Sequence, residues 1–101
     1  MPAKRRLLKD SELQKELKTL DGWRVVKGKL YREFKFENFA QAFGFMASVA
    51  IEAEGMNHHP DWFNVYDVVR INLVTHDLGG IGTFDIILAR KINELFNRKG
   101  R

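Results

Sequence analysis

Residues 38–54 restrict the fold of this chain more than any other segment, because they have the pattern of a helix that is apolar around most of its circumference. On a wheel of about 100° per residue, only a narrow strip is polar. A surface helix of a monomer needs an apolar face only somewhat wider than about 100°. We therefore predict a second burial partner for this helix, most simply another subunit, against the alternative of a helix sunk deep in its own domain. The polar strip holds Gln41, Ser48 and Glu52, and the apolar arc holds Phe39, Ala42, Phe43, Phe45, Met46, Ala47, Val49, Ala50, Ile51 and Ala53.

The segments on either side of this helix show two further helical patterns and four strand patterns. Ser11 with Gln14 is a capping signal for the first helix, and Asn38 with Gln41 is one for the middle helix. Strands are indicated by alternation of apolar and polar residues between turn signals. The predicted elements are a helix from Ser11 to Leu20, strands at 23–26 and 30–36, the helix at 38–54, strands at 62–66 and 68–75, and a helix from about Thr83.

This order, α-β-β-α-β-β-α, predicts an α+β fold. Consecutive strands favour hairpins, so we expect a four-stranded antiparallel sheet with the helices packed on one face. At 101 residues the chain is predicted to be a single domain, 1–101. Basic clusters at residues 1–7 and 97–101 contribute much of the net charge of +4, and we expect both ends to be frayed.

The composition excludes several classes of function. The chain has no cysteine, so disulfides, thiolate catalysis and cysteine-based zinc sites are excluded. The first residues lack the apolar core of a signal peptide, and no apolar run is long enough to span a bilayer, so a cytoplasmic protein is expected. The basic ends could contact nucleic acid. The lack of an interior basic patch interleaved with stacking aromatics argues against that role.

All three histidines of the chain, His58, His59 and His76, lie in one short stretch. Histidine is the side chain whose ordinary pKa, about 6.5, suits proton transfer near neutral pH. Pro60 restricts His59 to an extended backbone, so His58 and His59 are expected to point to opposite sides. Asp85 is expected in the first turn of the last helix, where the helix dipole favours a carboxylate. The set is typical of an acid/base site.

Four kinds of site compete for these residues. A metal site is disfavoured because adjacent histidines chelate one ion poorly and no His-x-His pattern exists. A Ser-His-Asp hydrolase is disfavoured because Ser11 and Ser48, the only serines, lie in helical patterns. Residues 79–82 form a glycine loop before a helix, but they match neither phosphate-binding fingerprint. General acid/base chemistry needs only positioned histidines and an orienting carboxylate. For any single histidine a structural role, such as packing against Trp62, remains an alternative.

The sequence resembles the pterin-4a-carbinolamine dehydratases. The resemblance is carried by residues 54–66, EGMNHHPDWFNVY, by residues 69–76, VRINLVTH, and by Gly80-Ile81 and Asp85. A looser pattern extends from Leu8 to Phe96. The family fold has the same α-β-β-α-β-β-α order.

The resemblance implies a lyase reaction. Water is eliminated from 4a-hydroxytetrahydropterin to give quinonoid dihydropterin, which recycles the pterin cofactor of aromatic amino acid hydroxylases. It implies no metal and no bound cofactor, since the pterin is the substrate. We expect His59 and His76 to transfer protons, His58 to orient the substrate, and Asp85 to position an imidazole. The remaining residues expected to bind or shape the substrate site are Glu54, Pro60, Trp62, Thr75 and Asp77.

The resemblance also implies a homodimer or homotetramer, formed through the 38–54 helix and a sheet edge. A second function follows from it, because animal members act as dimerisation cofactors of a homeodomain transcription factor; such a binding module requires no catalysis. Two positions depart from the family pattern. Gly82 stands where Ser or Thr is usual and is expected to be a weaker but tolerated helix cap. Phe84 occupies a commonly polar position.

Overall fold

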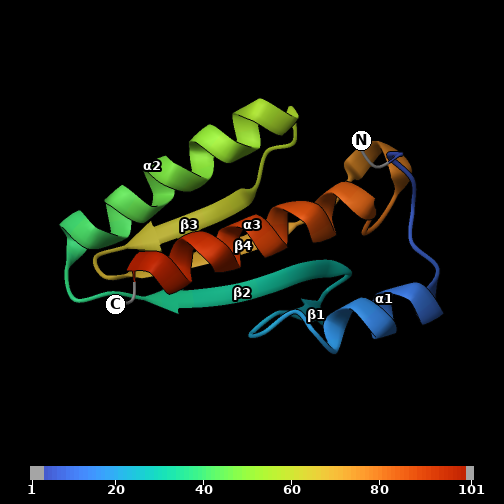
Figure 1. Cartoon of the computed structure of the whole chain (residues 1–101), viewed down its shortest axis with the longest axis horizontal. Coiled ribbons are helices and arrows are strands. Elements are labelled where there is room, and N and C mark those ends of the chain that lie inside the picture. The colour runs from blue at the N-terminus through green and yellow to red at the C-terminus, as the bar shows by residue number, and fades with distance from the viewer. Residues whose placement is uncertain (1–3, 100–101) are drawn as a thin grey trace.

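The computed structural model describes residues 4–99, which form three α-helices on a four-stranded sheet (Figure 1). The predicted order α-β-β-α-β-β-α is confirmed, with one added 3-10 helix, η1. The helices are α1 (Asp10–Leu17), α2 (Phe39–Met56), η1 (His76–Leu78) and α3 (Thr83–Lys99). The strands are β1 (Arg24–Val26), β2 (Lys29–Lys35), β3 (Asp61–Val65) and β4 (Val68–Leu73).

The sheet has the strand order β1-β2-β4-β3, and every neighbouring pair is antiparallel. A turn at Lys27-Gly28 joins β1 to β2, and both residues have positive φ, 53° and 78°. The β3–β4 turn lies at Tyr66-Asp67, because β3 ends at Val65, one residue before the predicted end of that strand at 66. Tyr66 takes the positive φ of 49°, and Val68 begins β4 because a β-branched residue resists that conformation.

The core lies between one face of the sheet and the helices. Alternate residues of the two central strands point toward the helices, as predicted, whereas Glu33 and Arg70 pair on the open face. Phe34 of β2 meets Phe45 of α2 and Phe96 of α3, each with ring centroids 5.0 Å apart. In Figure 1, α3 crosses in front of β4 and α2 runs alongside β3. The strand residues that are fully buried are Leu30, Phe34, Val69, Ile71 and Leu73.

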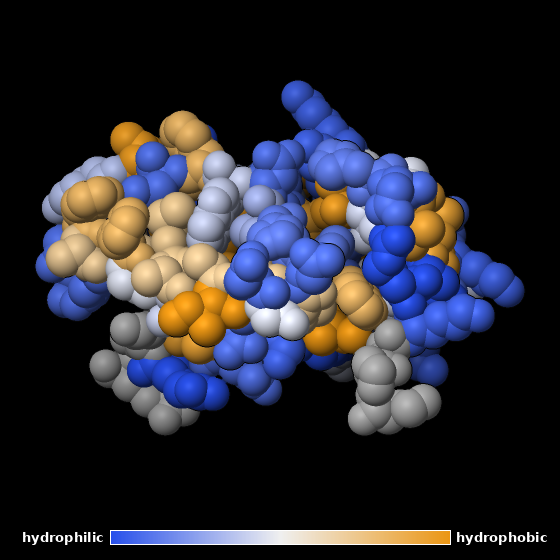
Figure 2. Space-filling view, turned by 90° about the horizontal axis from the view of Figure 1, so that it is seen from above, coloured by the Kyte–Doolittle hydropathy of each residue, from blue (hydrophilic) through white to orange (hydrophobic). Residues whose placement is uncertain are grey.

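The apolar arc of α2 is wider than the part of the helix that the rest of the domain covers. Only Ala42, Phe45, Val49 and Ala53 of this helix are buried. Phe39, Phe43 and Ile51 remain 51%, 57% and 73% exposed. Figure 2 shows hydrophobic side chains gathered on the face that α2 presents. The alternative of a helix sunk deep in its own domain is therefore wrong, and the predicted second partner remains a prediction.

The helix starts show one correct and one wrong assignment. The Asn38 side chain accepts from the backbone N–H of Gln41 at 2.9 Å, so the predicted cap of α2 is confirmed. The first helix begins before Ser11, at Asp10. The start is fixed by Glu12, whose side chain accepts from the backbone N–H of Lys9 at 2.9 Å.

Described residues near both ends of the chain have contacts or helical structure. Leu7 forms a bridge with Gly82, and the backbone N–H of Leu8 donates to the Ile81 carbonyl at 3.0 Å. At the other end, residues 97–99 continue helix α3. Residues 1–3 and 100–101 of the predicted ends lie outside the described residues. Among the helices of residues 4–99, none is both long and apolar enough to cross a membrane.

Candidate functional site

The site is built around the carboxylate of Asp85, which is fully buried in the first turn of α3. Its Oδ1 lies 2.5 Å from Nε2 of His58. Its Oδ2 accepts from the hydroxyl of Thr75 and from the backbone N–H of Gly82, both at 2.8 Å. When the carboxylate is ionised it only accepts hydrogen bonds, and Nε2 of His58 is then the donor in this contact. The three contacts fix both the carboxylate and the imidazole ring.

The end of α2 sets the direction of the two adjacent histidines. Asn57 ends the helix in the left-handed conformation, with φ 52°, and the backbone N–H of His58 donates to the Ala53 carbonyl at 3.0 Å. Residues 58–60 lie outside regular secondary structure. The His58 side chain is 10% exposed and contacts Asp85, whereas that of His59 is 57% exposed and contacts Glu54, so the two neighbours have different partners.

His59 has a different environment from His58. Its Nε2 lies 2.8 Å from Oε1 of Glu54, in the last turn of α2, and both side chains are largely exposed. Glu54 can therefore hold the ring in one orientation while solvent and a ligand still reach it. The pair gives the site a second imidazole with a carboxylate partner.

One pocket of about 440 Å³ brings all three histidines together. His58 lies in its wall, His59 at its rim, and His76 enters from η1, which follows β4. An acid and a base can thus approach one small molecule from different sides. The lining residues are Arg5, Asn57, His58, His59, Val74, Thr75, His76 and Asp77.

The residues expected to bind substrate divide into two groups. Thr75 and Asp77 line the pocket, and Glu54 adjoins it through His59. Pro60 and Trp62 are not among the lining residues. Trp62 is half-buried and packs against the core from β3, and Pro60 lies between the rim and that strand.

Phe84, at a position that departs from the family pattern, contacts the site from behind. Its ring meets the His58 ring edge-on, with centroids 6.1 Å apart. The apolar ring therefore packs beside the imidazole. Phe84 is not among the residues that line the pocket.

Three lining residues, Arg5, Asn57 and Val74, were not among the site residues expected from the sequence. Arg5 donates to both carboxylate oxygens of Asp77, at 3.0 and 2.6 Å, and these hydrogen bonds lower the pKa of Asp77. Arg5 had been assigned to a frayed basic end, and no local pattern distinguishes it. Asn57 did carry a signal, because asparagine is favoured where a helix ends in the left-handed conformation.

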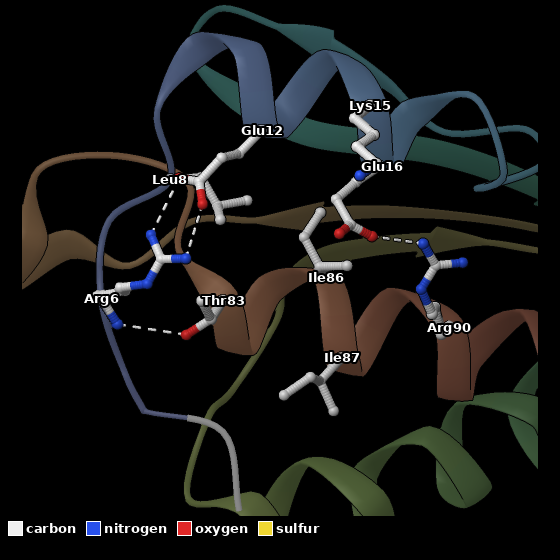
Figure 3. Close-up of a pocket in the computed structure, with 9 residues that line it drawn as sticks. All are labelled: Arg6, Leu8, Glu12, Lys15, Glu16, Thr83, Ile86, Ile87 and Arg90. Atoms are coloured by element: carbon white, nitrogen blue, oxygen red, sulfur yellow. Dashed lines mark hydrogen bonds and ion pairs between the residues drawn. The ribbon is translucent and has the colours of Figure 1, made fainter.

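A second depression, of about 420 Å³, lies between α1 and α3 (Figure 3). Four of its five charged side chains form ion pairs: Arg6 with Glu12 at 2.7 Å and Arg90 with Glu16 at 2.6 Å. The apolar residues that line it are Leu8, Ile86 and Ile87. None of the three histidines lines this depression; all three line the other pocket. No cluster of three or more His, Asp or Glu side chains in residues 4–99 could hold a metal ion.

Comparison with known proteins shows the family of this chain. A family model described as "Pterin 4 alpha carbinolamine dehydratase" matches residues 6–95. Proteins whose names contain "pterin-4-alpha-carbinolamine dehydratase" include one from Solibacter usitatus, 53% identical over 87% of this chain and 93% of its own. Another, from Prochlorococcus marinus, is 47% identical over 91% of this chain and 96% of its own.

A solved structure is similar to this chain in fold as well as in sequence. The "transcriptional coactivator/pterin dehydratase" from Brucella melitensis superposes with a TM-score of 0.84 at 47% identity, over 87% of this chain and 96% of that one. The family match extends over most of the chain and includes the segments that carry the histidines and Asp85. This chain therefore belongs to the pterin 4 alpha carbinolamine dehydratase family.

Proposed function

We propose that this protein is a hydro-lyase that removes water from a 4a-hydroxytetrahydropterin, such as 4a-hydroxytetrahydrobiopterin, and releases quinonoid dihydropterin. Its role would be to return the pterin cofactor of aromatic amino acid hydroxylases to a reducible form. The observation that carries the proposal is the single pocket in which three imidazoles meet, one of them anchored on buried Asp85. Family membership supplies the substrate class.

The reaction consists of two proton transfers and one bond cleavage. The 4a-hydroxyl is a poor leaving group until an acid protonates its oxygen. The C4a–O bond then breaks, a base takes the proton from N5, and the C4a=N5 double bond forms, so the products are water and the quinonoid dihydropterin. Histidine supplies both acid and base near neutral pH, and the proposed steps require neither a metal nor a bound cofactor.

The geometry supports a division of labour among the three histidines. His59 and His76 lie at the rim, are exposed, and come from different elements, so they suit the two proton transfers. His58 is held by Asp85 through Nε2, which leaves Nδ1 for the substrate, so it suits orientation. The imidazole that Asp85 positions is thus His58.

A spectrophotometric dehydration assay with 4a-hydroxytetrahydrobiopterin tests the proposal. We expect the His59→Ala, His76→Ala double variant to lose about 10²- to 10⁴-fold in kcat, the usual contribution of general acid/base catalysis. Glu94→Gln, at an exposed position on α3, is the control and should keep the wild-type rate. An undiminished rate in the double variant would refute the assigned roles.

We also propose that the exposed stripe of α2 and the sheet edge at β3 join copies of this chain into a homodimer or homotetramer. The stripe of Phe39, Phe43 and Ile51 is continuous along one helix, and β3 exposes Phe63 and Val65. The alternative function is a transcriptional coactivator-type binding module, which the name of the Brucella structure suggests for that protein. Replacing the histidines should abolish the dehydratase but leave such partner binding intact.

A further inference from the structure

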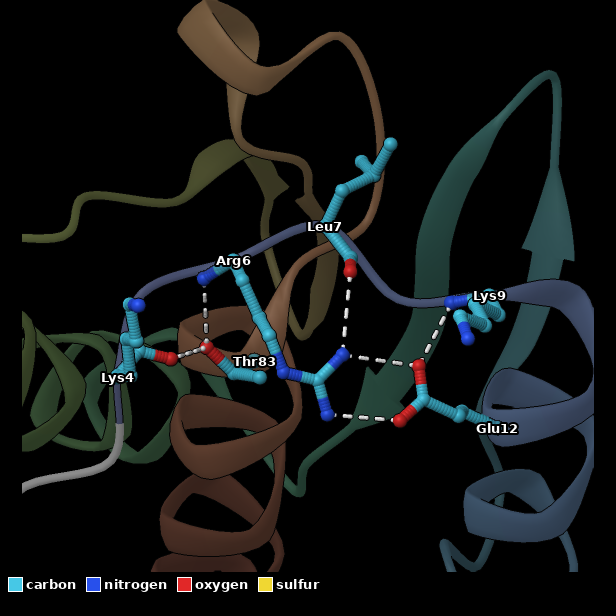
Figure 4. Close-up of polar contacts among 6 residues, drawn as sticks. All are labelled: Lys4, Arg6, Leu7, Lys9, Glu12 and Thr83. Carbon is cyan, nitrogen blue, oxygen red and sulfur yellow. Dashed lines mark hydrogen bonds and ion pairs between the residues drawn. The ribbon is translucent and has the colours of Figure 1, made fainter.

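The N-terminal strap, residues 4–8, runs along the loop that precedes α3 (Figure 4). The backbone N–H of Thr83 donates to the Arg6 carbonyl at 2.9 Å, and the Thr83 hydroxyl donates to the Lys4 carbonyl at 2.7 Å. A Cβ on Gly82 would lie only 2.9 Å from that Arg6 carbonyl oxygen. The strap therefore lies directly against the residue whose N–H binds Asp85, and the glycine is required for this close approach.

The two arginines of the strap point in different directions, as neighbours in an extended segment do. Arg6 reaches toward α1 and contacts both carboxylate oxygens of Glu12, at 2.9 and 2.7 Å. Arg5 lines the histidine pocket and contacts both carboxylate oxygens of Asp77. Each arginine of the strap thus forms a two-point contact with a carboxylate. Of these two contacts, only that of Arg5 lies at the histidine pocket.

Asp77 follows His76 in η1, so the Arg5 pair acts on the element that carries one of the proposed proton carriers. The polar backbone contacts of η1 are local: Leu78 and Gly79 donate to the Thr75 carbonyl, and Gly79 also to that of His76. Within residues 4–99, the pair with Arg5 is the side-chain hydrogen bond that ties η1 to a distant part of the chain. A two-point guanidinium–carboxylate contact fixes direction as well as distance.

We propose that Arg5 is a positioning residue for the dehydration: through Asp77 it holds η1, and with it His76, in place at the rim of the pocket. The inference rests on the proposed function. An exposed ion pair adds little to global stability, so its loss should lower the rate of the reaction rather than the free energy of unfolding. Misplacement of a proton carrier lowers the rate of the chemical step more than the binding of substrate.

Kinetics of Arg5→Gln and Arg6→Gln form a matched test, since both changes remove one arginine of the strap. We expect Arg5→Gln to lower kcat about tenfold with KM changed less than about twofold, and Arg6→Gln to leave kcat within about twofold. Asp77→Asn should resemble Arg5→Gln. The double variant should be no slower than the slower single variant, because both changes break the same contact.

A second measurement does not depend on activity. Backbone order parameters of residues 76–78 in the free protein should fall from about 0.85 toward about 0.6 in Arg5→Gln, and stay unchanged in Arg6→Gln. If the wild type has no dehydratase activity, the proposed function fails, and this measurement still decides the role of Arg5. The proposal is overturned if Arg6→Gln is equally slow, if Arg5→Gln raises KM alone, if the losses multiply in the double variant, or if the order parameters do not change.

Discussion

Nε2 of His58 lies 2.5 Å from Oδ1 of Asp85, and that carboxylate is completely buried under two further donors. Asparagine at position 85 would present an NH₂ group to at least one of these donors. We expect Asp85→Asn to lower the free energy of unfolding by on the order of 3 kcal/mol, because it breaks a buried charged contact. The same change should lower kcat about tenfold or more, because His58 loses its orientation.

Urea unfolding checks the stability part of this prediction. Thr75→Val is the matched control, because it removes one of the same donors and keeps the carboxylate; its cost should be nearer 1 kcal/mol. Equal stability of Asp85→Asn and wild type would show that the buried carboxylate is not held by these contacts.

The part of the structure that the sequence predicted is the part set by local pattern. Alternation along residues 69–73 gave the buried face of β4, and the capping signal at Asn38 gave the start of α2. The place of Arg5 was not predictable in this way, because its partner Asp77 lies 72 residues away. Ser11 was misassigned because Ser11 and Gln14 fit a capping motif that Lys9 and Glu12 form two residues earlier, through the backbone N–H of Lys9.

Glu54→Gln tests whether Glu54 orients His59 without contributing to the stability of the protein. Glu54 is among the most exposed acids of the site, so the change should alter the free energy of unfolding by less than about 0.5 kcal/mol. The neutral amide no longer stabilises a protonated His59, so kcat should fall severalfold, roughly 3- to 10-fold. Steady-state kinetics and urea unfolding on the same samples test this. A rate equal to that of the wild type would remove Glu54 from the site.

The Arg6–Glu12 pair predicts an acid-sensitive contribution to stability. Hydrogen bonds from Arg6 and from the Lys9 backbone lower the pKa of Glu12 from 4.5 to about 2. A carboxyl group whose pKa is lower in the folded state stabilises the protein above its unfolded pKa, and this contribution is lost as pH falls through the folded value. The stability difference between wild type and Glu12→Gln should therefore be constant above about pH 4.5 and shrink between pH 4.5 and 2. Urea unfolding across this range measures it. A difference that does not depend on pH would contradict the assigned pair.

Gly82→Ala tests whether the close approach of the strap requires glycine. The added Cβ would lie 2.9 Å from the Arg6 carbonyl oxygen and 3.2 Å from Oγ1 of Thr75, and the first of these is a backbone atom that can move only with the strap. We expect a loss of roughly 1–3 kcal/mol in the free energy of unfolding, the usual cost of overpacking. Gly55→Ala, where an added Cβ meets no atom within 4 Å, is the control and should not destabilise α2. If both variants are as stable as the wild type, the close contact between position 82 and the Arg6 carbonyl is wrong.

Phe43→Asn tests whether the exposed stripe of α2 joins subunits. Phe43 is 57% exposed in the single chain, so the change should cost the monomer little, but in an oligomer it would place a polar amide in an apolar interface. We expect the dissociation constant to rise at least about tenfold, as aromatic residues at the centre of an interface contribute most of the binding energy. Sedimentation velocity at micromolar concentration measures this, with Val25→Asn as the control. Val25 is an apolar residue, 41% exposed, in β1, at the edge of the sheet opposite β3. A wild type that sediments as a monomer would refute the subunit interface itself, and equal effects of the two changes would refute the place assigned to it.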